Sequence, residues 1–590
     1  MSSPADVLAP RVTAAIAAAF GEAYRDADPV LRPSRAAPGR AVGGHDADLQ
    51  ANAALAMAKR LGMPPRDVAD RIVEHLRLDG ICEAPEVSGP GFINLRLTDA
   101  WVAGEVQRVS GDERLGVPVQ ARENIPIDYS SPNVAKEMHV GNLRTTVVGD
   151  CLARTLEHLG HHVIRQNHIG DWGTPFGMLI EHLLDVGEGS AAATVLETDP
   201  NAFYQGARVK FDGDEAFSVR ARARVVSLQS GDVETLRLWA ELVDLSRHYF
   251  ERIYSVLGVT LTDQDLAGES MYNDELAGIC HELESRGIAT MSEGALCVFL
   301  DGYTGREGKP VPLIIRKSDG GYGYGTSDLA TIKYRIEQLH AHRALYVIGA
   351  PQALHLNMVW DTARKAGWLT DDVRVVHVQI GNVLGDDRKI LKTRSGAPPR
   401  LMALLDDAVA NARRVIDAAR PDLDESVRAG IAPQIGIGAV KYADLSVAHD
   451  SEYVFDLDRM LALTGNTGPY LQYAAARIRS IFRSAALDVA PAEGLERRIV
   501  VREPGERALA LALLQFGSVV TQVGDTLEPH RLCGYLFDLA QTFSSFYESC
   551  PVLKAESTDL RESRLGLCAL TLQVLVQGLD LLGVESPEQM

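Results

Sequence analysis

The amino-acid sequence predicts an α/β protein built around a parallel sheet, with an α/β accessory module before it and an all-α region after it. Three observations predict this class. Short β-type runs alternate with helical segments over residues 121–400, which is typical of βαβ units on a parallel sheet. Helical stretches precede a strand-like run within residues 1–120, and amphipathic helix fills residues 401–590. With 590 residues the chain is too long for one hydrophobic core, so several domains are expected.

The first predicted unit, residues 1–120, is a separate α/β module. Helices are expected at residues 12–24, 48–62 and 65–78, and the run GPGFINLRL at 89–97 reads as a strand.

Four β-type runs form the predicted parallel sheet of the second unit, residues 121–400. They are NIPIDYSS, HHVIRQNHIGDWG, RALYVIGA and VRVVHVQIG. A helix is expected at 143–160, and a long, charged, mostly helical insertion at about residues 178–290. Ligands bind beyond the carboxyl ends of the strands in an open parallel sheet, so we expect the site of this unit there.

Residues 401–465 are predicted to be connecting helices, and residues 466–590 a helical C-terminal domain. Runs such as RLMALLDDAVANARRVIDAA and CGYLFDLAQTFSSFYES repeat their apolar residues at helical spacing.

The composition, 46% hydrophobic and 23% charged, is ordinary for a soluble globular protein. A formal net charge of −20 counts against nucleic-acid binding, although a large acidic protein can gather basic residues on one face. Seven scattered cysteines without a CxxC pair argue against a disulfide framework or zinc ribbon and for a reducing cytoplasm.

No run of about 18 apolar residues and no signal-peptide pattern occur, so we expect no membrane span. Candidate basic patches include Arg477, Arg479 and Arg483, for which a solvated helix face is the alternative.

The stretch SSPNVAKEMHVGNLR, residues 130–144, is the predicted centre of the site, because it joins a strand end to the following helix. His139, Gly141 and Asn142 fall at that helix N-terminus, where free N–H groups and the helix dipole favour an anion. Gly141 allows close approach of the backbone or of an adenine ring. His139 and Asn142 can donate to phosphate oxygens, and Lys136 adds a mobile charge. A polar strand-to-helix turn is the alternative, since His-x-Gly-Asn is a short pattern.

This stretch resembles the HIGH signature of class I aminoacyl-tRNA synthetases, in the form typical of arginyl-tRNA synthetases. Other stretches resemble the same family in the family's order: NHIGDWGTPFGMLIEHL, RKSDGGYGYGTSDLATIKYR, ILKTRSG, GIGAVKYADLS, GNTGPYLQYAAARIRSIF and the ending LDLLGVESPEQM. The resemblance runs from GPGFINL to Met590. It implies a Rossmann-like class I catalytic domain, an N-terminal accessory tRNA-binding domain and a helical anticodon-binding domain.

The resemblance implies the reaction of an arginine–tRNA ligase. The arginine carboxylate attacks the ATP α-phosphate to give arginyl-adenylate and diphosphate, and the 3′-terminal ribose of tRNA(Arg) then takes the arginyl group. This chemistry depends on positioning and on stabilising charge on phosphate oxygens. ATP would arrive as its Mg²⁺ complex, with no metal site on the protein and no tightly bound cofactor. The implied catalytic residues are Lys136, His139, Asn142 and Lys392, and these together with Gly141 are the implied ATP-binding residues.

The resemblance also implies a pocket for L-arginine. A guanidinium group has five donors and calls for carboxylates and other acceptors in fixed positions. Asp128 and Asp328 are the implied carboxylates, and Tyr324 lies one helical turn before Asp328. Taken alone, Asp128 is equally explained as a capping acid and Tyr324 as a core aromatic residue. The α-ammonium and carboxylate of arginine are assigned to Ser131, Asn133 and Gln352.

Three places depart from the family pattern. Asn142 stands where most members have histidine, and an amide can donate a hydrogen bond but cannot be protonated. The KMSKS-like run at 390–394 lacks lysine at its first and fourth positions, and Lys136 is then thought to supply the missing charge. Gly349 and Pro351 occupy positions where acidic and basic residues are common.

Four residues are implied to contact tRNA. Phe92 and Asn94 would stack on and bond to a splayed base of the tRNA elbow, with a buried strand as the alternative for Phe92. Tyr547 and Met590 would help to read the anticodon, with plain helix core as the alternative for Tyr547.

The leading hypothesis is therefore a cytoplasmic, monomeric arginine–tRNA ligase with no obligate protein partner. One alternative is a paralogue that supplies arginyl-adenylate or arginyl-tRNA to a specialised pathway or confers resistance, which Asn142 keeps open. Another is a tRNA-binding protein without catalysis.

Overall fold

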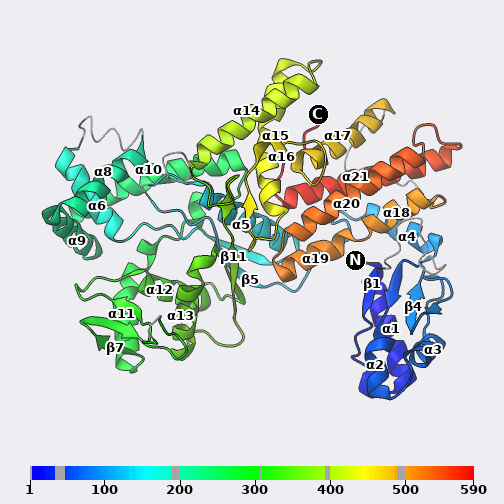
Figure 1. Cartoon of the computed structure of the whole chain (residues 1–590), viewed down its shortest axis with the longest axis horizontal. Coiled ribbons are helices and arrows are strands. Elements are labelled where there is room, and N and C mark those ends of the chain that lie inside the picture. Colours follow the sequence, from blue (N-terminus) through cyan, green and yellow to red (C-terminus); the bar gives the residue numbers. More distant parts are fainter. Residues whose placement is uncertain are drawn as a thin grey trace.

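The computed structural model describes residues 3–33, 47–134, 136–188, 190, 199–305, 308–392, 399–485, 487 and 498–590. The N-terminal module forms a lobe at one end of the molecule, and the C-terminal helices lie beside it (Figure 1). The parallel sheet lies near the centre, and the helices of the insertion form the opposite end (Figure 1).

The N-terminal module packs helices on an antiparallel sheet with strand order β1-β2-β4-β3. One prediction was wrong here: residues 49–51, expected within a helix, form strand β2, which pairs with β1 and β4 on its two sides. Cross-strand pairing overrides the local helical pattern because it buries Leu49 and Ala51. The elements are α1 (Pro4–Phe20), η1 (Glu22–Tyr24), β1 (Leu31–Pro33), β2 (Leu49–Ala51), α2 (Ala53–Leu61), α3 (Pro65–His75), β3 (Glu86–Ser88), β4 (Phe92–Leu95) and α4 (Asp99–Ser110).

All four predicted runs of the central sheet are confirmed as parallel strands in the order β11-β10-β5-β6. Strand β10 shows why the sheet is covered on both faces. Its residues Leu345 and Val347 join the core that contains α5, whereas Ala344 and Tyr346 join the core that contains α12 and α13. The elements are β5 (Asn124–Asp128), α5 (Val140–His158), β6 (His162–Gln166), α12 (Tyr324–Glu337), β10 (Arg343–Gly349), η4 (Ala350–Gln352), α13 (Ala353–Lys365) and β11 (Arg374–Ile380).

Helix α5 connects the parallel-sheet unit to the C-terminal helices. It contacts β5, β6 and β10 on one side and α14, α15, α19 and α21 on the other. Its predicted apolar side is confirmed, since all six residues are buried: Leu143, Val147, Val148, Leu152, Leu156 and Leu159. Because the helix is enclosed, its position is determined by both units.

The insertion at about 178–290 is mostly helical, as expected, and a three-stranded antiparallel sheet that was not predicted, β7-β8-β9, begins at its end and continues beyond it. The elements are α6 (Thr174–Val186), α8 (Pro200–Gly213), α9 (Glu215–Gln229), α10 (Val233–Leu257), η2 (Asp263–Asp265), η3 (Glu269–Tyr272), α11 (Asn273–Ser285), β7 (Ala289–Ser292), β8 (Ala295–Val298) and β9 (Leu313–Arg316).

In the described residues after β11, the regular elements are helices and the short parallel pair β12 (Val383–Leu384) and β13 (Tyr453–Val454). Two stretches of the described chain, 504–526 and 558–581, are long and apolar enough to cross a membrane by length and composition, which the sequence analysis did not expect. Both pack inside the helical unit, and most of 558–581 is buried there. The helices are α14 (Leu401–Ala419), α15 (Glu425–Leu445), α16 (Leu457–Met460), α17 (Gly468–Ser484), α18 (Pro504–Leu513), α19 (Phe516–Thr526), α20 (His530–Ser549) and α21 (Thr558–Leu581).

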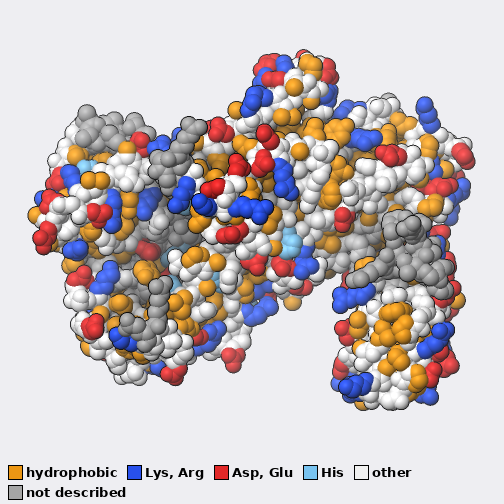
Figure 2. Space-filling model, in the orientation of Figure 1, with side chains coloured by type: hydrophobic (Ala, Val, Ile, Leu, Met, Phe, Trp, Pro, Cys, Tyr) orange, Lys and Arg blue, Asp and Glu red, His pale blue; other side chains and the backbone are white. Residues whose placement is uncertain are grey.

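Acidic and basic side chains are interspersed over the face shown in Figure 2. Two arginines of the predicted basic patch are used inside the protein. Arg479 donates to Ser586 Oγ at 2.8 Å, and Arg483 donates to the carbonyl of Glu588 at 3.2 Å. These contacts hold the C-terminal segment, so the two guanidinium groups have a structural role.

Candidate active site

The His-x-Gly-Asn stretch begins helix α5 beyond the carboxyl end of β5, as predicted. His139 is the N-cap residue. Its Nδ1 accepts a hydrogen bond from the N–H of Gly141 at 3.0 Å, and its own N–H donates to Oδ1 of Asn142 at 3.1 Å. Because Nδ1 accepts, the ring proton lies on Nε2, from which it can be donated to a ligand. Burial and, secondly, Lys136 lower the pKa of His139, which favours this neutral form.

The helix cap at His139 also explains why asparagine and glycine stand at positions 142 and 141. The side-chain oxygen of Asn142 closes the first turn of the helix, so only its amide nitrogen is left for a phosphate. A Cβ atom on Gly141 would lie 2.7 Å from Cε1 of His139. Glycine is therefore needed so that the imidazole can fold back over the helix start, a reason that the sequence did not reveal.

Both oxygens of Asp128 are engaged by the protein. Oδ2 lies 2.9 Å from Nη2 of the buried Arg335, and Oδ1 accepts a hydrogen bond from Ser131 Oγ at 2.6 Å. The N–H of Ser131 donates to Oδ1 of Asn167 at 3.0 Å. Asp128 thus shapes the loop after β5. Because both of its oxygens are used by the protein, these contacts do not favour its predicted contact with the guanidinium of a bound arginine.

Asp328 lies between two histidines. Its Oδ2 is 2.6 Å from Nε2 of His355, and its Oδ1 is 3.8 Å from Nε2 of His168. Tyr324, at the start of α12, is 68% exposed and packs its ring edge-on against His355 at 4.9 Å between centroids. Tyr324 is therefore not a core aromatic residue. Tyr324 and Asp328, which were predicted to face one pocket, both contact His355.

Sequence reasoning missed a third acid, Glu269, at the start of η3. Its carboxyl group lies near Asp328 and Asp171, and burial together with these two charges raises its pKa to about 8. Among the described residues, no lysine or arginine forms an ion pair with Glu269 or Asp328. Carboxyl groups that no lysine or arginine of the described chain pairs with are suited to bind a cationic side chain.

The loop that carries Glu269 is held by the GDWG stretch, residues 170–173, which lies within one of the family-like runs of the sequence. Asp171 accepts hydrogen bonds from the N–H of Ser270 at 2.9 Å and from its hydroxyl at 2.6 Å. The N–H of Glu269 donates to the carbonyl of Ile169 at 3.2 Å. An isolated acid in a loop has no sequence signal, but the buried Asp171 that anchors this loop lies within a recognised motif.

The remaining predicted residues differ in their exposure and contacts. Lys136 is half-buried, with Nζ 4.4 Å from the ring centre of Tyr204 in α8. Asn133 is exposed and bridges to Gly170 beside the GDWG stretch. The structure leaves Gln352 and Lys392 exposed, and the predicted residues 393 and 394 of the KMSKS-like run lie outside the described part of the chain.

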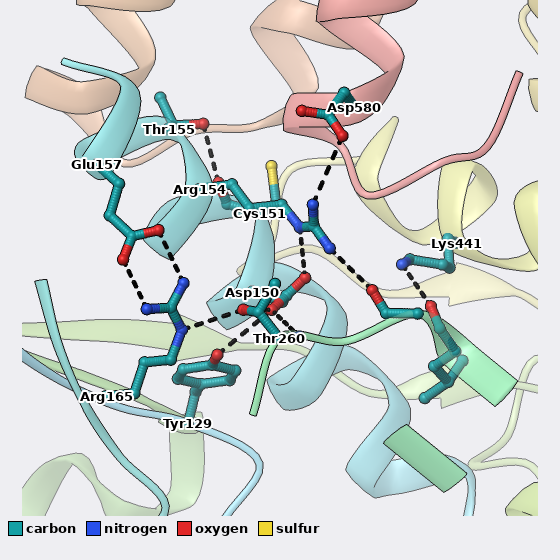
Figure 3. Close-up of polar contacts among 12 residues, drawn as sticks. Tyr129, Asp150, Cys151, Arg154, Thr155, Glu157, Arg165, Thr260, Lys441 and Asp580 are labelled. Atoms are coloured by element: carbon teal, nitrogen blue, oxygen red, sulfur yellow. Dashed lines mark hydrogen bonds and ion pairs between the residues drawn. The ribbon is translucent and has the colours of Figure 1, made fainter. Parts of the chain in front are cut away.

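Helix α5 is anchored behind the site by a polar cluster (Figure 3). Asp150 accepts hydrogen bonds from the Tyr129 hydroxyl at 3.3 Å, from the N–H of Thr260 at 2.8 Å and from Arg154 at 2.8 Å. Arg154 also lies 3.7 Å from Asp580 of α21. The cluster links the end of β5, helix α5, the segment of the insertion that follows α10, and the C-terminal unit, so it fixes the direction of the helix whose N-terminus carries His139.

The four residues predicted to contact tRNA differ in their burial and in their contacts within the protein. Asn94 is buried and already bonded to Gln50 and Ser88, while Phe92 in the same strand is half-buried. Tyr547 is half-buried, with its ring 6.1 Å from that of Phe543 and the guanidinium of Arg477 5.1 Å from its centre. The side chain of Met590 packs in an apolar pocket between α14 and α15.

Three family models match the chain. The model for tRNA synthetases class I (R), catalytic domain, matches residues 105–457. The DALR anticodon binding domain matches residues 471–590, and the arginyl tRNA synthetase N terminal domain matches residues 7–97.

Full-length relatives and solved structures agree with these models. The arginine–tRNA ligase of Thermobifida fusca (strain YX) is 68% identical over 590 residues and covers 100% of both chains. That of Frankia casuarinae is 50% identical and covers 98% of this chain and 97% of its own. The crystal structure of arginyl-tRNA synthetase from Plasmodium falciparum matches with a TM-score of 0.83 at 26% identity over 100% of both chains. The Thermus thermophilus arginyl-tRNA synthetase matches in fold, with a TM-score of 0.79 at 24% identity over 98% of this chain and 99% of that one.

Proposed function

The chain belongs to the arginyl-tRNA synthetase family and is an aminoacyl-tRNA ligase, and from this premise we propose how its residues divide the reaction. The observation that carries the proposal is the pairing of two groups at the carboxyl ends of the parallel strands. One is the capped helix start at His139, and the other is the acidic cluster of Glu269 and Asp328. The first group is suited to phosphate and the second to a guanidinium.

ATP is proposed to lie at the start of α5. Nε2 of His139, the free amide nitrogen of Asn142 and the ammonium groups of Lys136 and Lys392 would stabilise the charge that develops on the α-phosphate. Mg²⁺ would be held by the phosphates and water more than by carboxylates of the protein.

Arginine is proposed to place its guanidinium between Glu269 and Asp328, with Tyr324 at the rim. Ser131, Asn133 and Gln352 would hold its α-ammonium and carboxylate, which brings the carboxylate towards the α-phosphate. Asp128 supports this arrangement indirectly, because it orients the Ser131 hydroxyl.

The domain roles are also proposals. Residues 1–120 would contact the tRNA elbow through Phe92 and Asn94, residues 121–400 with the insertion at about 178–290 would perform catalysis, and residues 401–465 would connect to an anticodon-binding domain at 466–590. Tyr547 and Met590 would contact the anticodon. We further propose a cytoplasmic monomer. The names of the relatives lend no support to the specialised or non-catalytic alternatives.

One assay tests the proposal. Purified protein with ATP, Mg²⁺ and unfractionated tRNA is given each amino acid in turn, and the aminoacylated tRNA is measured. Charging with arginine alone is expected, with loss of turnover in Lys136→Ala and His139→Ala while tRNA affinity is largely kept. Turnover that survives both substitutions would contradict the proposed ATP site.

A further inference from the structure

Lys136 is held by an aromatic ring of the insertion. Its Nζ lies 4.4 Å from the ring centre of Tyr204, within the distance at which a cation is attracted to the face of a ring. Tyr204 lies near the start of α8, far along the chain from the strand end that precedes Lys136. The insertion therefore reaches the edge of the proposed ATP site.

The same helix also holds the next residue. Glu137 lies 2.8 Å from Nε of Arg400, and Nη2 of Arg400 lies 3.2 Å from Oδ1 of Asp199. Asp199 is the N-cap of α8 and accepts the N–H of Ala202 at 3.0 Å. Lys136 and Glu137 are thus both tied to the start of α8, one through Tyr204 and the other through Arg400.

The backbone of this segment is fixed as well. The N–H of Leu401 donates to the carbonyl of Met138 at 2.9 Å, and the N–H of Val140 donates to the carbonyl of Pro399 at 3.1 Å. These bonds hold the backbone on both sides of His139, and the Lys136 ammonium, three residues earlier in the chain, is held by its contact with the Tyr204 ring.

A ring differs from a carboxylate as a partner for this ammonium. Among the described residues no acid forms an ion pair with Lys136, so its charge is held but not neutralised. Burial lowers the pKa of His139 most, and the positive charge of Lys136 lowers it further. An anion that binds at the helix start can therefore gain from both the ammonium group and the imidazole.

We propose that Tyr204 is a positioning residue that holds the Lys136 ammonium beside His139 for the phosphates of ATP. The insertion then takes part in ATP activation although it carries none of the proposed ATP ligands. This inference rests on the proposed role of Lys136. The competing explanation is that Tyr204 only packs against the core, because its ring is half-buried there.

Matched substitutions separate these explanations. Tyr204→Phe keeps the ring face, and Tyr204→Leu keeps an apolar side chain without a ring. In aminoacylation assays Tyr204→Leu is expected to lower kcat about three- to thirtyfold, with KM for arginine unchanged, and Tyr204→Phe to stay within about twofold of the parent. Equal kcat for Tyr204→Leu and the parent would overturn the inference.

A double-substitution cycle excludes a purely structural effect. If Tyr204 acts through Lys136, Tyr204→Leu has no further effect on kcat when Lys136→Ala is already present. Independent, multiplying losses in the two variants would overturn the inference, whatever their melting temperatures. Lys136→Ala with unchanged turnover would instead remove the proposed role of Lys136 itself, so the two failures are distinguishable.

Discussion

Nε2 of His355 lies 2.6 Å from a carboxylate oxygen of Asp328, and the exposed ring of Tyr324 packs against the same imidazole. The histidine therefore fixes the direction of the carboxylate that is proposed to bind arginine. It is a residue of α13, whereas Asp328 and Tyr324 belong to α12.

Replacing His355 by leucine is expected to raise KM for arginine about tenfold, because a hydrogen bond to a charged group is lost and the carboxylate is left free to turn. His355→Gln keeps a donor and should recover part of the loss. Both values come from aminoacylation at varied arginine, with kcat at saturation as the control. An unchanged KM in His355→Leu would mean that Asp328 is oriented by other contacts.

Arginine binding is expected to depend on pH through Glu269. Its pKa of about 8 in the empty site means that most molecules carry a proton there at neutral pH. A guanidinium favours the ionised carboxylate, so affinity should rise from about pH 6 to about pH 8 and then level off.

Titration calorimetry in buffers of different ionisation enthalpy measures the protons that are released. At pH 7 arginine binding should release protons, and Glu269→Gln should bind more weakly with this release removed. His168 and His355 also face Asp328, so the variant is needed to assign the proton to Glu269. Equal proton release in the parent and in Glu269→Gln would contradict the assignment.

Gly141→Ala is expected to lower kcat at least about tenfold without lowering the melting temperature. The added Cβ meets Cε1 of His139 at 2.7 Å and turns the ring away, whereas alanine is a better helix former than glycine. Gly278→Ala in α11 is the matched control, since no atom lies within 4 Å of its Cβ position. Similar activity of the two variants would show that the ring position does not matter.

The parts of the fold with a strong local pattern could be predicted from the sequence. The four parallel strands and the apolar side of α5 are examples, because strand and helix periods are written in neighbouring residues. Residues 49–51 were misassigned because their strand is stabilised by pairing with two other strands.

In the candidate site, too, local relationships could be predicted from the sequence and long-range contacts could not. His139 and Asn142 meet within one helical turn, so their proximity follows from sequence spacing, although the cap they form does not. Glu269 joins Asp328 only through the folded loop that Asp171 holds, and Asp128 turns to Arg335, which follows it by more than two hundred residues. Partners that distant cannot be read from spacing.

The central claim is that carboxylates of this cluster recognise the guanidinium group of arginine, and discrimination against citrulline tests it most directly. Citrulline carries a neutral urea of nearly the same shape. The ratio of kcat/KM for arginine to that for citrulline is measured in the parent, in Glu269→Gln and in Asp328→Asn. We predict that each substitution lowers the ratio at least about thirtyfold, because a charge-assisted pair is lost for arginine only. An unchanged ratio in both variants would contradict the account.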